Sequence, residues 1–173
     1  MARNPSSSPR QTKKDARTTH RDSTEPLILV VEDEPSDSAR LKAMLAMCVP
    51  HARVHFVLRG WEAKAYLARK SPHHDWERCP APSLVILDLG LPDIKGIDIL
   101  EWMAEWDWLA RIPVIVFTGS EDAEQERRAY ALGVRRYLRK PNDWSALAEA
   151  ARAELGPIGT EPQKPSQVHQ VTD

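Results

Sequence analysis

The chain has 173 residues, of which 42% are apolar and 28% are charged, and its formal net charge is −1; this length allows one ordinary globular domain with tails but not two large domains. No stretch approaches the roughly 20 consecutive apolar residues that a membrane-spanning helix needs, and the two cysteines cannot form a disulfide framework. The near-zero net charge also disfavours a dedicated nucleic-acid binder, so we expect a cytoplasmic protein that binds neither nucleic acid nor a membrane.

The two ends of the sequence differ in composition from its middle. Residues 1–25 hold six Lys or Arg against three acidic residues and almost no apolar side chains. Residues 156–173 mix Gly, Pro and Gln with isolated charges. Neither segment can bury enough apolar surface to offset the entropy of ordering. We therefore expect a disordered basic N-terminal tail, one domain at 26–155 and a disordered C-terminal tail.

Short apolar runs predict five β-strands. Leu27–Val31, Leu84–Leu87 and Val114–Phe117 are continuously apolar, whereas Arg53–Leu58 and Val134–Leu138 are weaker candidates. A continuous apolar run, as opposed to an alternating one, is typical of a strand whose two faces are both covered. The runs therefore favour a parallel sheet flanked by helices.

Helical periodicity fills the segments between these strands. Four apolar residues between Leu41 and Cys48 are spaced so that they share one face of a helix. Gly133 follows the fourth helical segment and is a natural C-terminal cap. The sequence thus predicts a doubly wound α/β protein of (βα)5 order with one long surface connection at 70–83. The other expected helices are Trp61–Arg69, Ile97–Glu105, Glu121–Leu132 and Trp144–Leu155.

Polar residues follow the expected strands at the edge where open parallel sheets bind ligands. Glu32 and Asp33 follow the first strand, Asp88 the third, Thr118 the fourth and Lys140 the fifth. Three crowded carboxylates repel one another unless a cation neutralises them, and their hard oxygen atoms suit Mg²⁺ or Mn²⁺. With such a metal, Asp88 can attack a phosphoryl group whose oxygens the ammonium and the hydroxyl also contact. The alternative, that each acid merely ends a strand in a solvated loop, explains these residues singly but not together.

Four stretches of the sequence resemble the receiver domain of two-component response regulators. They are ILVVEDEPSD at 28–37, LVILDLGLPDIKG at 84–96, IPVIVFTGSED at 112–122 and YLRKP at 137–141. The resemblance spans the whole expected domain and implies a flavodoxin-like receiver fold with five parallel strands in the order 2-1-3-4-5. It also implies a phosphoprotein of a phosphorelay that is not an enzyme.

The resemblance assigns roles around a metal. Asp88 becomes the phosphoacceptor, Asp33 a direct Mg²⁺ ligand, and Glu32 an acid that acts largely through metal-bound water. The backbone carbonyl of Gly90 becomes the remaining protein ligand. Glu32 departs from the commonest pattern, in which two aspartates form the acidic pair, but its extra methylene should not abolish metal binding.

The resemblance also implies a conformational switch. Thr118 and Lys140 become the residues that contact the phosphoryl group, and the bond before Pro141 is usually cis in this family. Tyr137 matches the aromatic switch position and is expected to turn from outward to inward when Asp88 is phosphorylated. This movement would reshape the face formed by the fourth helix, the fifth strand and the fifth helix.

The implied phosphodonor is a sensor histidine kinase. A histidine phosphotransfer protein is a further implied partner, as is a second copy of the chain bound through the fourth helix, fifth strand and fifth helix. Too few residues follow position 155 for a DNA-binding effector, which favours a stand-alone receiver. The connection at 70–83 and the stretch FTGSEDAEQERRAYALGVRRYLRKPND resemble response regulators of bacterial phytochrome kinases.

Two other functions remain open at this point. One is a scaffold that acts without phosphorylation, against which the intact Asp88, Thr118 and Lys140 argue. The other is a phosphatase of the haloacid-dehalogenase type, which shares the nucleophilic aspartate, the lysine and Mg²⁺. That class places a general-acid aspartate two residues after the nucleophile, where this sequence has Gly90.

Overall fold

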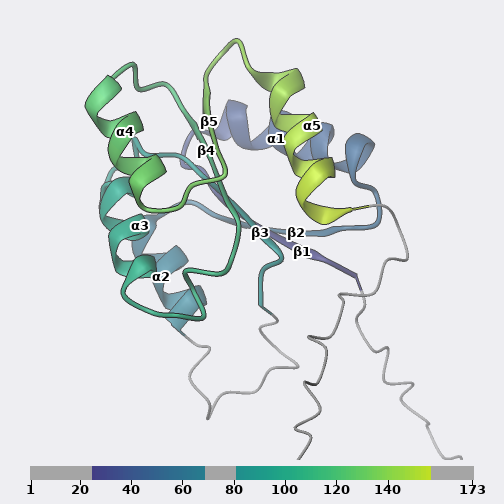
Figure 1. Cartoon of the computed structure of the whole chain (residues 1–173). Helices are drawn as coiled ribbons and strands as arrows, with labels where there is room; N and C mark the ends of the chain where they lie inside the picture. Colours follow the sequence, from purple (N-terminus) through teal and green to yellow (C-terminus); the bar gives the residue numbers. More distant parts are fainter. Residues whose placement is uncertain (1–24, 69–80, 157–173) are drawn as a thin grey trace, which may run out of the picture.

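A computed structural model describes residues 25–68 and 81–156 of the chain. Five strands and five helices alternate along these residues, and the strands form a single parallel sheet (Figure 1). The strands are β1 (Leu27–Val31), β2 (Arg53–Val57), β3 (Leu84–Leu87), β4 (Val114–Thr118) and β5 (Arg136–Arg139). Their order in the sheet is β2-β1-β3-β4-β5, which confirms the predicted doubly wound (βα)5 fold.

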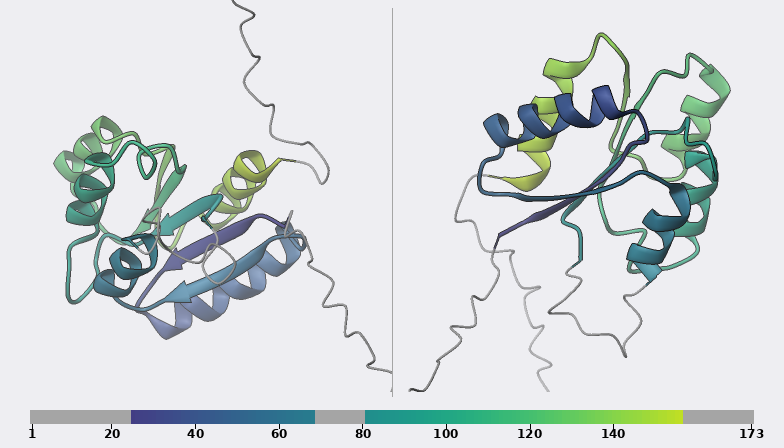
Figure 2. Two further views of the ribbon diagram at one scale, coloured as in Figure 1. Left: turned by 90° about the horizontal axis from the view of Figure 1, so that it is seen from below. Right: turned by 180° about the vertical axis from the view of Figure 1, so that it is seen from behind.

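Helices cover both faces of this sheet. They are α1 (Pro35–Cys48), α2 (Gly60–Ala68), α3 (Gly96–Ala104), α4 (Ala123–Ala131) and α5 (Trp144–Leu155). Figure 2 shows α1 and α5 side by side on one face, while α2, α3 and α4 cover the other. The carboxyl ends of the strands are left free at one edge, where the loops that lead into the helices begin.

The core consists of two apolar layers, one on each face of the sheet. In β1, Ile28 and Val30 belong to the layer under α1 and α5, whereas Leu29 and Val31 belong to the layer under α2 and α3. All residues of β1, β3 and β4 are buried, because each face of these strands meets helices. Burying each such aliphatic side chain contributes about 1.5 to 3 kcal/mol, which explains why the runs are continuously apolar.

The fifth strand begins two residues later than the sequence predicts. Gly133 has a φ of 90°, and the Val134 N–H donates to the Ala129 carbonyl at 3.2 Å. Val134 therefore still belongs to the turn that ends α4. Pairing with β4 begins where Arg136 lies opposite Ile115, so the predicted boundary at Val134 is wrong.

Two helices begin where acidic side chains cap them. Glu34 precedes α1 and its carboxylate accepts from the Ser36 N–H, so α1 begins at Pro35 and is longer than its apolar periodicity indicates. Asp122 accepts from the Glu124 N–H at 2.9 Å, so α4 begins after residue 122 and not at Glu121. These caps satisfy backbone donors that the first turn of a helix leaves unpaired. The first turn of α1 consequently lies at the free edge of the sheet.

Several expectations concern parts of the chain outside the described residues. Most residues of three predicted segments are outside the described ranges: the N-terminal tail at 1–25, the connection at 70–83 and the C-terminal tail at 156–173. Among the helices of the described ranges, none combines the length and apolar content needed to cross a bilayer.

Asp93 joins the loop after β3 to the start of α2. Its two carboxylate oxygens accept from the N–H groups of Gly60 and Trp61, each at 2.9 Å. Burial acts to raise the pKa of Asp93, but the hydrogen bonds from Trp61 and Gly60 outweigh it and hold this pKa below its ordinary value of 3.8. The ionised carboxylate is therefore the form that stabilises the fold.

We expect Asp93→Ala to lower the free energy of unfolding by about 1 kcal/mol at neutral pH, as for other lost helix caps. Because the folded-state pKa is lowered, the stabilisation is fully present above pH 3.8 and is lost as the pH falls through the lower folded-state value. Urea unfolding at a series of pH values measures this. The control is Asp107→Ala, at an exposed aspartate outside the helices. An Asp93 variant as stable as this control at pH 7 would contradict the capping role.

Candidate phosphoryl-transfer site

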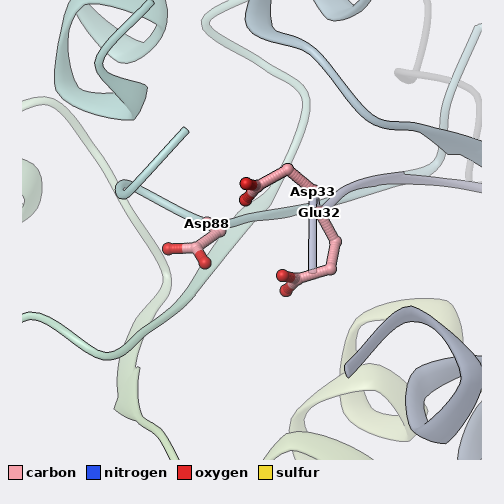
Figure 3. A group of neighbouring side chains, drawn as sticks. All are labelled: Glu32, Asp33 and Asp88. Carbon is pink, nitrogen blue, oxygen red and sulfur yellow. The ribbon is translucent and has the colours of Figure 1, made fainter. Parts of the chain in front are cut away.

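The carboxyl ends of four strands bring the predicted site residues together. Glu32 and Asp33 follow β1, Asp88 follows β3, Thr118 ends β4 and Lys140 follows β5. Figure 3 shows the carboxylates of Glu32, Asp33 and Asp88 extending into the same space. One oxygen of each lies within 4.8 Å of the other two. Glu32, Asp88 and Thr118 are buried, and Asp33 is half-buried.

Backbone contacts fix the direction of the Asp88 side chain. The Asp88 N–H donates to the Val31 carbonyl at 3.0 Å, which continues the pairing of β3 with β1. One carboxylate oxygen, Oδ1, accepts from the Gly90 N–H at 2.9 Å. Gly96 packs so tightly that a Cβ there would lie 2.5 Å from the Asp88 carbonyl oxygen. These contacts fix the Asp88 backbone and its Oδ1 atom. The second carboxylate oxygen, Oδ2, faces the pocket.

The Lys140 ammonium lies at the centre of this pocket. Its Nζ is 2.6 Å from Glu32 Oε2, 2.8 Å from Asp88 Oδ2 and 2.9 Å from Asp37 Oδ2. The bond between Lys140 and Pro141 is cis, as the sequence resemblance predicts. The lysine therefore bridges the ends of β1, β3 and β5 and the first turn of α1.

Burial and neighbouring charges shift the pKa values of Glu32 and Lys140. Burial raises the pKa of Glu32, and the hydrogen bond from Lys140 offsets this only in part. Burial also acts to lower the pKa of Lys140, but hydrogen bonds to Asp88 and Glu32 outweigh it, so this pKa lies above its ordinary value. Lys140 therefore stays positively charged throughout the physiological pH range.

The donor set of the site fits a divalent cation. Glu32, Asp33 and Asp88 bring their carboxylates together, and the Lys140 ammonium contacts two of them, Glu32 and Asp88, so acidic groups outnumber basic ones at the site. Clustered carboxylate oxygens with excess negative charge are the ligands that Mg²⁺ and Mn²⁺ prefer. Oxygens of Glu32, Asp33 and Asp88 would hold the ion, with the backbone carbonyl of Gly90 as a predicted fourth donor.

Thr118 and Tyr137 lie beside the pocket. The Thr118 hydroxyl accepts from the Ser120 N–H at 3.3 Å. Tyr137 is only 7% exposed, and burial raises its pKa. Its ring lies 6.5 Å from that of Tyr130 in α4, and its N–H donates to the Tyr130 hydroxyl. The expectation that Tyr137 starts from an outward position is therefore wrong for this structure, because packing against α4 buries the ring.

Asp37 is a residue of the site that the sequence patterns do not predict. Asp37 is the third residue of α1 and belongs to its first turn. Acidic residues are common in the first turn of a helix whether or not they belong to a site, because the positive end of the helix dipole stabilises them. Its contact with Lys140 joins residues more than 100 positions apart, and no local pattern signals it.

Comparisons with known proteins agree with this geometry. Residues 28–152 match the model of the response regulator receiver domain. Response regulator Rcp1 of Synechocystis sp. (strain PCC 6803) is 32% identical over 121 residues, which cover 70% of this chain and 80% of Rcp1. The transcriptional regulatory protein KdpE of Mycobacterium tuberculosis is 32% identical over 134 residues, which cover 75% of this chain but only 50% of KdpE.

Solved structures show the same architecture. The Mn²⁺-bound form of response regulator Rcp1 has a TM-score of 0.67 and 28% identity, with coverage of 80% of this chain and 99% of that one. The phosphorylated cyanobacterial phytochrome response regulator RcpA has a TM-score of 0.63 and 29% identity, and the match covers 75% of this chain and 90% of RcpA.

Proposed function

The chain belongs to the family of response regulator receiver domains, and we propose that it is a phosphorylation switch whose phosphoacceptor is Asp88. Members of this family are signalling domains that are phosphorylated on an aspartate, and they are not classical enzymes. The observation that carries the proposal is the 2.8 Å contact between the Lys140 ammonium and the Asp88 carboxylate. It lies in a pocket that also holds Glu32 and Asp33. A nucleophilic carboxylate beside a fixed cation and a metal site is what phosphoryl transfer requires.

In the proposed reaction, an oxygen of Asp88 attacks the phosphorus atom of a phosphohistidine on a sensor histidine kinase. The new P–O bond forms as the P–N bond breaks, and the imidazole nitrogen that leaves takes up a proton from water. Lys140 then pairs with the phosphoryl oxygens, and the Thr118 hydroxyl turns to donate to them. The transferred group adds negative charge and strong acceptors where Asp88 had a single carboxylate.

Mg²⁺ or Mn²⁺ is the cofactor that this reaction needs. When bound, the ion offsets the charge of the phosphoryl oxygens in the transition state. Asp33 would be a direct ligand, Glu32 would act largely through metal-bound water, and Gly90 would contribute its backbone carbonyl. The Mn²⁺-bound form of Rcp1 supports this choice of metal.

We also propose that the kinase is of the phytochrome type. RcpA, one of the similar structures, is a cyanobacterial phytochrome response regulator. We propose that the receiver unit spans residues 26–155, and the family match over residues 28–152 supports these bounds. A histidine phosphotransfer protein is the alternative partner for onward transfer.

The proposed output surface is the face formed by α4, β5 and α5, through which a second copy would bind. Arg139 of β5 pairs with Glu126 of α4 at 2.5 Å, and Arg128 of α4 pairs with Glu101 of α3. These ion pairs connect α4 to its neighbours, so a shift at β5 would be transmitted to the helix. Charged side chains at a surface suit regulated association, because they set partner choice and orientation.

One experiment tests the proposed function. We expect the chain to gain one phosphoryl group, about 80 Da, on incubation with acetyl phosphate and Mg²⁺, and to gain none with EDTA. Phosphorylated phytochrome kinase from the same organism should transfer its phosphoryl group faster than an unrelated histidine kinase does. Sedimentation should then show self-association of the phosphorylated chain.

Two outcomes would contradict this proposal. A chain that stays unmodified acts as a scaffold, and rapid release of phosphate without a stable adduct indicates a phosphatase. Either result would refute the switch.

A further inference from the structure

Asp37 contacts the Lys140 ammonium but does not belong to the acidic cluster that could hold a metal. Its Oδ2 lies 2.9 Å from Nζ of Lys140, whereas the cluster found among the described residues consists of Glu32, Asp33 and Asp88. Asp37 lies in the first turn of α1, so the helix backbone fixes its position at the edge of the pocket. Asp37 can therefore hold the lysine without competing for the metal ion.

The Lys140 ammonium has as many donors as it has carboxylate partners in the described structure. A lysine ammonium can donate three hydrogen bonds, and Glu32, Asp88 and Asp37 each supply one acceptor oxygen within 2.9 Å. The Lys140 side chain is only 12% exposed. Water therefore replaces a lost acceptor poorly, and removal of Asp37 should leave the ammonium less firmly placed.

We propose that Asp37 is a positioning residue that fixes the Lys140 ammonium beside Asp88 and thereby raises the rate of phosphoryl transfer. This inference rests on the proposed function of Asp88. In the reaction, an oxygen of Asp88 leaves the ammonium to bond to phosphorus, so Glu32 and Asp37 are the partners that still hold Lys140. Because the Lys140 ammonium is then already positioned, it can stabilise the charge on the phosphoryl oxygens without first reorienting.

Two other effects of Asp37 must be separated from positioning. An acid in the first turn of a helix stabilises the helix through its dipole, which affects unfolding but not the reaction. The negative charge of Asp37 also repels an anionic phosphodonor, so its loss alone would speed the reaction. Positioning makes the opposite prediction, namely that loss of the acceptor oxygen slows the reaction.

Three variants distinguish these effects. Asp37→Ala removes both the charge and the acceptor, whereas Asp37→Asn removes the charge but retains an oxygen that can accept from Lys140. Glu34→Ala is the matched control, because Glu34 is an exposed acid that caps the same end of α1. We expect Asp37→Ala to slow phosphorylation by acetyl phosphate on the order of tenfold at saturating Mg²⁺. Asp37→Asn should restore most of the rate, and Glu34→Ala should leave it unchanged.

The decisive readout is whether the effect depends on Lys140. In a Lys140→Met background, Asp37→Ala should change the phosphorylation rate by less than about twofold, since the group that it positions is gone. An Asp37→Ala variant that reacts at the wild-type rate or faster, or that slows equally in the Lys140→Met background, would overturn the inference and leave Asp88 as the phosphoacceptor. A wild-type chain that takes up no phosphoryl group would instead refute the proposed function, and this inference with it.

Discussion

An Asp88→Asn variant is expected to take up no phosphoryl group from acetyl phosphate or from a kinase. The amide is nearly isosteric with the carboxylate, and its single oxygen can still accept from one of the two donors that contact Asp88, the Gly90 N–H or the Lys140 ammonium. It lacks the nucleophilic oxygen, so the rate should fall by more than about a hundredfold. The fold should persist, and removing one of the crowded charges should leave the stability unchanged or higher.

Intact mass spectrometry measures the uptake by the Asp88→Asn variant, and circular dichroism reports on its fold. The matched control is Asp98→Asn, an exposed aspartate in the first turn of α3, which should be phosphorylated at the wild-type rate. A folded Asp88→Asn variant that still gains the group at the wild-type rate would show that another residue is the phosphoacceptor.

An Asp33→Ala variant is expected to lose binding of Mg²⁺ that the wild-type chain should show in the high micromolar to millimolar range. A site with few protein ligands that leaves several waters on the ion gives affinities of about this size. The carboxylates that the Lys140 ammonium contacts are those of Glu32, Asp37 and Asp88, and Asp33 is not among them. The substitution should therefore remove a metal ligand without releasing the lysine.

Titration of tryptophan fluorescence or of NMR shifts with Mg²⁺ measures this loss in the Asp33→Ala variant. Glu34→Ala removes a carboxylate from the adjacent position, whose side chain points to the cap of α1, and should bind Mg²⁺ as the wild type does. Equal affinity in the Asp33→Ala variant and this control would remove Asp33 from the metal site.

The sequence specifies the central strands of this fold closely. The predicted limits of Leu27–Val31 and Leu84–Leu87 agree with those of β1 and β3, because strands covered on both faces must be apolar throughout and polar residues bound them. The fifth strand is less well specified. Val134 is as apolar as a strand residue but packs in the turn that ends α4, and apolarity alone does not separate the two cases.

The candidate site is predictable only where the backbone places its residues. Glu32, Asp33, Asp88, Thr118 and Lys140 converge because each follows or ends a strand, and the carboxyl ends of parallel strands meet at one edge. The contact of Asp37 with Lys140 depends on the reach of a long side chain across the pocket. The inward position of Tyr137 depends on its packing against α4. Neither follows from local sequence.

The position of the phosphoryl group on the wild-type chain identifies the phosphoacceptor. Borohydride reduces an aspartyl phosphate to homoserine, and peptide mass spectrometry then identifies the modified position. After incubation with acetyl phosphate, we predict homoserine at position 88 in samples that contained Mg²⁺ and none in samples that contained EDTA. Homoserine at Asp33 or another aspartate, or none in a sample whose intact mass shows the adduct, would contradict the assignment of Asp88 as the phosphoacceptor.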